Sequence, residues 1–279
     1  MRHFYWVDLQ AVQVNHIDVA LQSGRDPPAV AQPNQRGGAG GVTLHQHLDR
    51  QLGFIKMLNK DLPYEPVKDF TPVALIGSVP VAIFINPASG ILSIQDLVAA
   101  AKAKPGQLSY SSSTGLLSLT HLAGELFCQR ADVKMIHVPY SGAQAQYFAD
   151  LIGGRLQAAI TGLTSGLALA REGKIKLIGI ASRERSKLAP DAPAVGEIFP
   201  NFDVPAWFAF AVAAGTPANI VQKLETATLA ALRDPATRAQ FGAVGVDLGP
   251  FLDSSGLAAK IAIDNQMWEK TFRSAGLMK

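Results

Sequence analysis

Hydroxyl-bearing residues gather in one short stretch of the chain, at 110–115, which reads Tyr-Ser-Ser-Ser-Thr-Gly. The stretch lies between a predicted strand over 108–111 and a predicted helix over 120–130. A loop that enters a helix N-terminus presents free backbone N–H groups and the positive end of the helix dipole. Five hydroxyl groups exceed what helix capping needs, so the pattern predicts an anion-binding turn made by Ser111, Ser112, Ser113 and Gly115.

Two further loops share this character. One covers 138–143 and carries Tyr140, Ser141 and Gly142, and the other covers 161–165 and begins at Thr161. Each follows the carboxyl end of a predicted strand, the edge at which open parallel sheets bind ligands. Three or four hydrogen bonds to an anion, at about 2 kcal/mol each, would give micromolar affinity for a carboxylate. This inventory contains no nucleophile or general base, so it favours binding over catalysis.

Histidines offer the main route to other chemistry. His45 and His47 have the spacing that puts two rings on one face of a strand, but no third metal ligand has suitable spacing. His121 and His137 allow an enzyme that uses one of them as a base, although hydrogen-bonded structural histidines are favoured. We therefore expect no catalytic residue, no metal and no cofactor.

Charge and composition exclude several classes of protein. The 279 residues include 25 Lys and Arg against 22 Asp and Glu, a net charge of +3 without a basic block, so we expect no nucleic-acid partner. No apolar run reaches the 18–20 or so residues of a membrane helix. The single cysteine, Cys128, excludes an internal disulfide. The glycines of 37–41 lack the pattern of a dinucleotide-binding loop.

Residues 1–60 are rich in turn formers and show no persistent helix or strand period, whereas strands and helices alternate from residue 61 onward. This alternation predicts an α/β protein with mostly parallel sheets. The predicted strands are 70–77, 79–86, 108–111, 134–138, 156–160, 177–181 and 207–213. The predicted helices are 94–104, 120–130, 144–152, 165–171, 217–232, 235–241 and 255–275.

From residue 61 to its end the chain resembles the Bug-type periplasmic solute receptors of tripartite tricarboxylate transporters. The stretches that carry the resemblance include LPYEPVKDFTPVALIGSVP at 62–80, DLVAAAKAKPGQLSYSSS at 96–113, VPYSGA at 138–143, DLIGGRLQAAI at 150–160 and WFAFAVAAGTP at 207–217. Ser111, Ser112, Ser113 and Gly115 match the family's serine/glycine loop, and Tyr140, Ser141 and Gly142 match its second loop. Thr161 stands where many members carry Asp.

The resemblance implies a two-lobed α/β periplasmic-binding-protein (Venus-flytrap) architecture. Its first lobe would comprise 1–104 and 208–279, with 1–60 atypical, and its second lobe 105–207. It also implies a monomer that holds a small organic acid, a di- or tricarboxylate or a related acid, in a cleft and presents it to the membrane permease subunits of the transporter.

The N-terminal region departs from the family. Arg36 and residues 38–41 resemble the family's arginine–glycine segment, yet the chain reaches Leu62 about a dozen residues early, so the first lobe is expected to be divergent or truncated. The family is periplasmic, although residues 1–10 do not read as a signal peptide. Two alternatives remain open, namely an effector-binding regulatory module and a degraded member that no longer binds a ligand.

Overall fold

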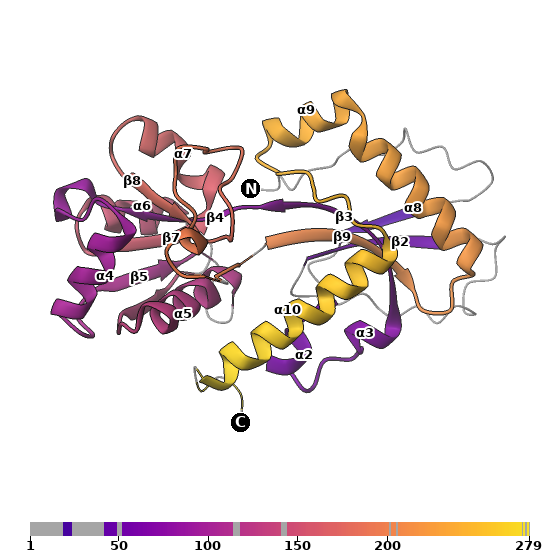
Figure 1. Ribbon diagram of the computed structural model, residues 1–279, viewed down its shortest axis with the longest axis horizontal. Helices are drawn as coiled ribbons and strands as arrows, with labels where there is room; N and C mark the ends of the chain where they lie inside the picture. Colours follow the sequence, from indigo (N-terminus) through magenta and orange to yellow (C-terminus); the bar gives the residue numbers. More distant parts are fainter. Residues whose placement is uncertain are drawn as a thin grey trace. The chain divides into compact units, whose positions relative to one another are not determined.

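The computed structural model describes residues 19–23, 42–48, 52–113, 118–140, 144–200, 202–204, 206–274, 276 and 278. Strands and helices alternate along most of this length (Figure 1). The strands are β1 Val19–Ser23, β2 Val42–Leu48, β3 Phe70–Val79, β4 Val81–Ile85, β5 Ser109–Ser112, β6 Ile136–Pro139, β7 Ala158–Gly162, β8 Lys176–Ile180 and β9 Ala206–Ala213. The helices are α2 Ile55–Leu58, α3 Pro66–Asp69, α4 Ile94–Ala103, α5 Leu119–Ala131, α6 Gln144–Ile152, α7 Leu163–Arg171, α8 Ala218–Arg233, α9 Pro235–Ala243 and α10 Ser254–Ser274, with short 3₁₀ turns at Pro87–Ser89 and Val195–Glu197.

The elements predicted after residue 61 are confirmed, most of them to within two residues of their bounds. The helix at 144–152 coincides with α6, and α4 begins as expected after Ser93, whose hydroxyl accepts the Asp96 N–H at 3.1 Å. Such a cap satisfies one of the backbone donors that a helix start leaves unpaired. Local sequence signals were therefore sufficient to predict the helices and strands in this part of the chain.

The strands form two sheets, with the orders β1-β2-β9-β3 and β6-β5-β7-β4-β8. In the second sheet β5 runs parallel to β6 and to β7, whereas β4 is antiparallel to both β7 and β8. In the first sheet β1 and β2 are parallel, and β2 and β9 are antiparallel. The prediction of mostly parallel sheets is therefore corrected to two mixed sheets.

The reversed strand β4 explains this correction. It follows β3 after the single residue Pro80, without the helical crossover that brings a chain back to lie parallel. An alternating order of strands and helices predicts parallel pairing only where a helix separates the strands. Strands β5, β6, β7 and β8 consequently share one direction, and their carboxyl ends lie at the edge of the sheet where β4 begins.

The chain divides into two compact units, each built around one of the sheets. One comprises 1–77, 208–240 and 248–265, and the other 78–207, 241–247 and 266–279. The division differs from the predicted lobe boundary at 104/105, because β4 pairs with β7 and β8 and therefore belongs with the second sheet. The chain passes from one unit to the other inside β3 and at the start of β9, and again within α9, after residue 247 and within α10.

Residues 1–60 hold more regular structure than the sequence predicts. Strand β2 pairs with β1 on one side and with β9 on the other, so neighbouring strands supply the pairing that its interrupted apolar pattern does not indicate. Arg36 and residues 38–41 lie outside the described residues. No helix in the described part of the chain is both long and apolar enough to cross a membrane.

Candidate functional site

The carboxyl ends of β5, β6 and β7 are neighbours in the second sheet. Ser112 of β5 pairs with Pro139 of β6 on one side and with Ile160 of β7 on the other. The residues that directly follow these three are Ser113, Tyr140 and Thr161. Each of them belongs to a different one of the three predicted binding loops. The structure therefore brings Ser113, Tyr140 and Thr161, the described residues at these strand ends, to one edge of one sheet.

Helix α5 begins at the same edge. The Ser118 hydroxyl caps the helix by accepting the His121 N–H at 3.2 Å, and Thr120 Oγ1 accepts the N–H of Ser113 at 3.1 Å. A further contact of 3.3 Å joins the hydroxyls of Ser113 and Thr120. The end of β5 is thus tied to the first turn of α5, whose backbone N–H groups and dipole favour an anion.

A glycine lets α5 lie directly on β5. A Cβ at Gly124 would lie 2.1 Å from Cε2 of the Tyr110 ring, closer than any side chain tolerates. The Tyr110 hydroxyl in turn donates to Glu125 Oε1 at 2.6 Å. The close approach and the hydrogen bond together hold the helix in place relative to the strand.

Among the predicted residues, Ser111 and Ser112 point to opposite sides of the sheet, as alternation along a strand requires. Both are at most 1% exposed. Ser112 Oγ lies 2.8 Å from Nε2 of His137, whereas the Ser111 hydroxyl has no hydrogen-bond partner within the described part of the chain. Ser113 is half-buried, which makes it the most accessible of the three serines.

Thr161 and Tyr140 use their hydroxyls inside the protein. Thr161, 1% exposed, shares a hydrogen bond of 2.9 Å with the hydroxyl of Tyr147 on α6. The Tyr140 hydroxyl donates to Asp150 Oδ2 at 2.5 Å, and burial raises the pKa of Tyr140 to about 12. Arg155 donates to the same carboxylate at 2.6 Å. These hydroxyls hold the loops to α6.

The remaining predicted residues, Gly115, Ser141 and Gly142, lie outside the described residues. Sequence reasoning missed the partners of the described hydroxyls, above all His137, Thr120 and Tyr147. Ser118 precedes the predicted helix 120–130 and Thr120 begins it, and hydroxyl residues at a helix start are a local signal for their role. His137 and Tyr147 meet their partners only through strand pairing and helix packing, for which the sequence carries no local signal.

His121 and His137 are hydrogen-bonded, buried or half-buried residues, as the structural interpretation of them predicts. Burial, followed by the charge of His121, lowers the pKa of His137 to about 4. The Nε2 atom of His137 is engaged by the hydroxyl of the fully buried Ser112. Within the described residues no group of three His, Cys, Asp or Glu side chains is arranged to hold a metal ion.

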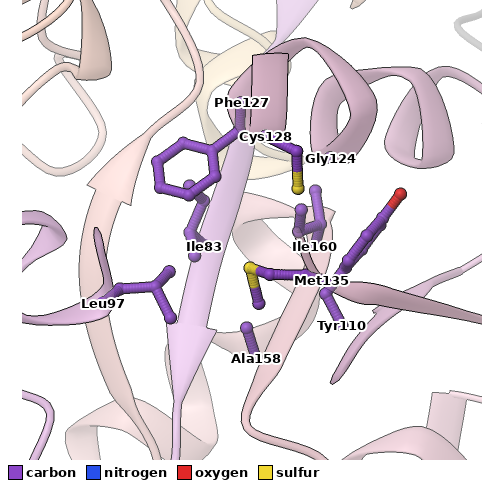
Figure 2. Close-up of a pocket in the computed structure, with 9 residues that line it drawn as sticks. All are labelled: Ile83, Leu97, Tyr110, Gly124, Phe127, Cys128, Met135, Ala158 and Ile160. Atoms are coloured by element: carbon purple, nitrogen blue, oxygen red, sulfur yellow. The ribbon is translucent and has the colours of Figure 1, made fainter. Parts of the chain in front are cut away.

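Two cavities lie in the second unit, away from the carboxyl edge of β5–β7. One is a void of about 10 Å³ between α5 and the sheet, and the sulfur atoms of Cys128 and Met135 are directed into it (Figure 2). Its apolar lining and its size, about one water molecule, exclude an organic acid. The other, of about 470 Å³, lies beside Asn86 at the carboxyl end of β4 and beside the end of α6, at the opposite edge of the sheet.

Comparison with known families identifies one match. The model of a tripartite tricarboxylate transporter family receptor matches residues 30–274. A UPF0065 protein of Bordetella bronchiseptica is 31% identical over 205 residues, which are 74% of this chain and 60% of that protein. The protein BugT of Bordetella pertussis is 30% identical over 241 residues, 81% of this chain and 73% of BugT. The chain thus spans about 60% of the length of the first of these relatives.

Solved structures agree with this match. A protein of R. palustris solved with adipate superposes with a TM-score of 0.71 at 27% identity, over 84% of this chain and 78% of that one. MatC from Rhodopseudomonas palustris, solved with bound malate, gives a TM-score of 0.65 at 27% identity, over 82% and 78%. The fold is that of the periplasmic binding proteins.

Proposed function

Because the chain belongs to the family of tripartite tricarboxylate transporter receptors, we propose that it is a periplasmic receptor that captures a small carboxylate and delivers it to membrane permease subunits. The observation that carries the proposal is that β5, β6 and β7, which lead into the three loops, end side by side at one sheet edge, beside the start of α5. Adipate and malate in the two similar structures support a dicarboxylate as the ligand class.

The described residues divide into two roles. Ser113, half-buried, and the first-turn N–H groups of α5 contact the carboxylate. Gly115, Ser141 and Gly142, which lie outside the described residues, keep the binding role that the family resemblance implies. Ser111, Ser112, Thr161 and Tyr140 lie behind them and hold the backbone of the loops in position, since three of their hydroxyls are bonded within the protein. The acid is bound and released without a chemical change, because none of these groups is a nucleophile or base.

A panel of adipate, malate, citrate and acidic amino acids tests the proposal by calorimetry and thermal denaturation. A ligand that binds only the folded state raises the Tm with concentration, and we expect at least one dicarboxylate to do so with micromolar affinity. A flat response across the panel, in protein shown to be folded, contradicts the proposal and favours a member of the family that has lost ligand binding.

Substitution locates the site. We expect Ser113→Ala to weaken binding by about 10–100-fold, because a hydrogen bond to an anion is worth about 1.5–3 kcal/mol. Ser255→Ala on α10, an exposed serine of the other unit, is the matched control and leaves the affinity unchanged. If Ser113→Ala and Ser255→Ala bound the acid with equal affinity, the carboxylate would bind at a place other than Ser113.

The assembly and location are tested separately. We expect a monomer in light-scattering measurements, with and without the acid. In the intact organism the protein is expected in the periplasmic fraction, and cross-linking there is expected to join it to permease subunits only when the acid is present. Recovery of the protein from the cytoplasmic fraction, or with DNA, would instead support a regulatory module.

A further inference from the structure

The end of α9 and the residues after it form a short segment, Phe241–Asp247, which belongs to the second unit, whereas the chain before and after it belongs to the first. Backbone hydrogen bonds join Asp247 to Ser78 in both directions, at 2.8 and 2.9 Å. The Ser186 hydroxyl also donates to Asp247 Oδ2 at 2.7 Å. The end of the segment is therefore bonded to two separate parts of the second unit.

Gly245 terminates the helix within this segment. Its N–H donates to the Gly242 carbonyl at 3.0 Å, and the N–H of Val246 donates to the Phe241 carbonyl at 3.0 Å. These two bonds form a Schellman motif, which needs a residue in the left-handed region, and Gly245 has a φ of +79°. Gly245 also lies against the first turn of α7, because a Cβ at position 245 would be 2.0 Å from Thr164 Cγ2.

This contact leaves no room for a side chain at position 245. Rotation of Thr164 would not make enough room, because its Cβ would still lie 3.1 Å from the added atom, and ordinary contact begins at 3.4 Å. The start of α7 is held by the Leu163 N–H, which donates to the Pro80 carbonyl at 2.8 Å. Pro80 is two residues from Ser78, so one short stretch of chain holds both α7 and the segment Phe241–Asp247.

The first turn of α7 is part of the predicted binding edge. Thr164 belongs to the third predicted loop, 161–165, all of which the structure describes. Strand β7 ends and α7 begins within this loop. The Ser165 hydroxyl accepts a hydrogen bond of 3.0 Å from the side chain of Gln144, the first residue of α6. A displacement at Thr164 would therefore reach the starts of two helices.

We propose that Gly245 is a positioning residue for carboxylate binding, since its contact with Thr164 lets the segment Phe241–Asp247 fix the place of the loop 161–165 and of the start of α6. Gly245 acts through Thr164 and touches no acid itself. A side chain at position 245 pushes the first turn of α7 out of place. The inference rests on the proposed function, because it concerns the same carboxylate site.

Gly245→Ala tests the proposal in the whole chain. Calorimetry measures the affinity for malate and adipate, and NMR follows the backbone amides of Ser165 and Gln144. We expect the affinity to fall roughly 10–100-fold, because a displacement of about 1 Å can cost that much, and we expect both amide signals to shift. An affinity equal to that of the wild type, or amide signals that stay in place, overturns the proposal.

Gly173→Ala is the matched control for backbone strain. Gly173 has a φ of +71°, yet nothing lies within 4 Å of a Cβ added there, just beyond the last residue of α7. We expect this variant to lower the Tm and to leave the affinity and the two amide signals as in the wild type. If Gly173→Ala and Gly245→Ala lost the same affinity, strain alone would explain the loss, and the proposal would be wrong.

Thr164→Ala provides a second comparison. It removes the methyl group that a Cβ at position 245 would strike and leaves only the approach of 3.1 Å. Gly245→Ala should therefore cost much less affinity when it is added to Thr164→Ala than when it is added to the wild type. The same loss in both backgrounds would contradict the proposal, because Gly245 would then not act through Thr164.

Ser186→Ala serves if Gly245→Ala does not fold. It removes the hydrogen bond to Asp247 and leaves position 245 unchanged. We expect the amide signals of Thr164 and Ser165 to shift, and shifts confined to residues 245–247 overturn the proposal.

A wild type that binds neither malate nor adipate contradicts the proposed function without deciding the role of Gly245. The amide signals then decide that role. Signals of Ser165 and Gln144 that move in Gly245→Ala and move less in the Thr164→Ala background support the positioning role of Gly245. Signals that stay in place overturn it.

Discussion

The Tyr140 hydroxyl donates to Asp150 Oδ2 at 2.5 Å, and this hydrogen bond ties the residue that follows β6 to helix α6. The hydrogen bond from Tyr140, followed by that from Arg155, holds the pKa of Asp150 below its ordinary value. The carboxylate thus stays ionised in the folded protein under conditions in which it is protonated in the unfolded chain.

Tyr140→Phe tests this contact. We expect the Tm to fall by about 2–4 °C at pH 7, the effect of one lost hydrogen bond in a protein of this size. A carboxyl group with a lowered folded pKa stabilises the fold above its unfolded pKa and loses that contribution as the pH falls through the folded pKa. The difference between variant and wild type should therefore shrink as the pH falls below the ordinary pKa of an aspartate, about 4.

Tyr147→Phe is the matched control, since it removes a bond to the Thr161 hydroxyl, which does not titrate in acid. Its effect on the Tm should be the same from pH 7 to pH 3. If the loss of Tm caused by Tyr140→Phe were also the same at every pH, Asp150 would not accept this hydrogen bond in solution.

The carboxylate of Glu197 closes a turn after β8. It accepts two hydrogen bonds from Arg185, at 2.7 and 2.9 Å, and one from the Ala194 N–H at 2.9 Å. The bonds from Arg185, then that from Ala194, lower the pKa of Glu197 to about 2. Glu197→Gln should lower the Tm at neutral pH, and the loss should shrink as the pH falls from above 4 toward 2.

Glu172→Gln provides the comparison, because Glu172 has one exposed ion pair, 2.8 Å long, with Lys174. Exposed pairs contribute little, so this variant should melt within about 1 °C of wild type. Equal melting shifts for the two variants would show that the turn does not depend on Glu197.

The reactivity of the buried Cys128 thiol reports local opening of the second unit. Burial raises the pKa of its thiol to about 12, so the thiolate is nearly absent at pH 8. Reaction with a thiol reagent at pH 8 should be roughly 10³-fold slower in the folded protein than in denaturant, where the pKa returns to its ordinary range. Since the chain has one cysteine, the rate reports a single site. Rapid labelling of the native protein would contradict the burial.

Ser111 carries a buried hydroxyl that lacks a partner within the described residues. Removing an unpaired buried polar group costs no hydrogen bond, so Ser111→Ala should melt at the same temperature as wild type or slightly above it. Ser112→Ala, which deprives His137 of its contact, should melt lower. Because Ser111 lies behind the residues proposed to contact the carboxylate, Ser111→Ala should keep its carboxylate affinity, and a large loss of affinity would place the Ser111 hydroxyl in the site.

The sequence predicted much of this architecture, because most elements after residue 61 carry their own signals, such as the Ser93 cap. The sequence indicated that the three loops follow the carboxyl ends of strands, and the strand pairing places the ends of β5, β6 and β7 side by side. The roles of the predicted site residues remain a proposal.

Other features could not be predicted from local sequence signals. Strand β4 is reversed because no helix separates it from β3. Strand β2 depends on its partners for pairing. The meeting of Ser112 with His137 arises from residues 25 positions apart, brought together by strand register. Such pairings depend on contacts between residues that are distant in the sequence, so local sequence signals do not predict them.

The close approach of Gly124 to Tyr110 has a consequence for how such chains diverge. Position 124 cannot acquire a side chain while the aromatic ring remains at 110, so the two positions should change together among homologues. A descendant with alanine or serine at the helix position is expected to carry a smaller residue on the strand, and to have lost the phenol that anchors Glu125.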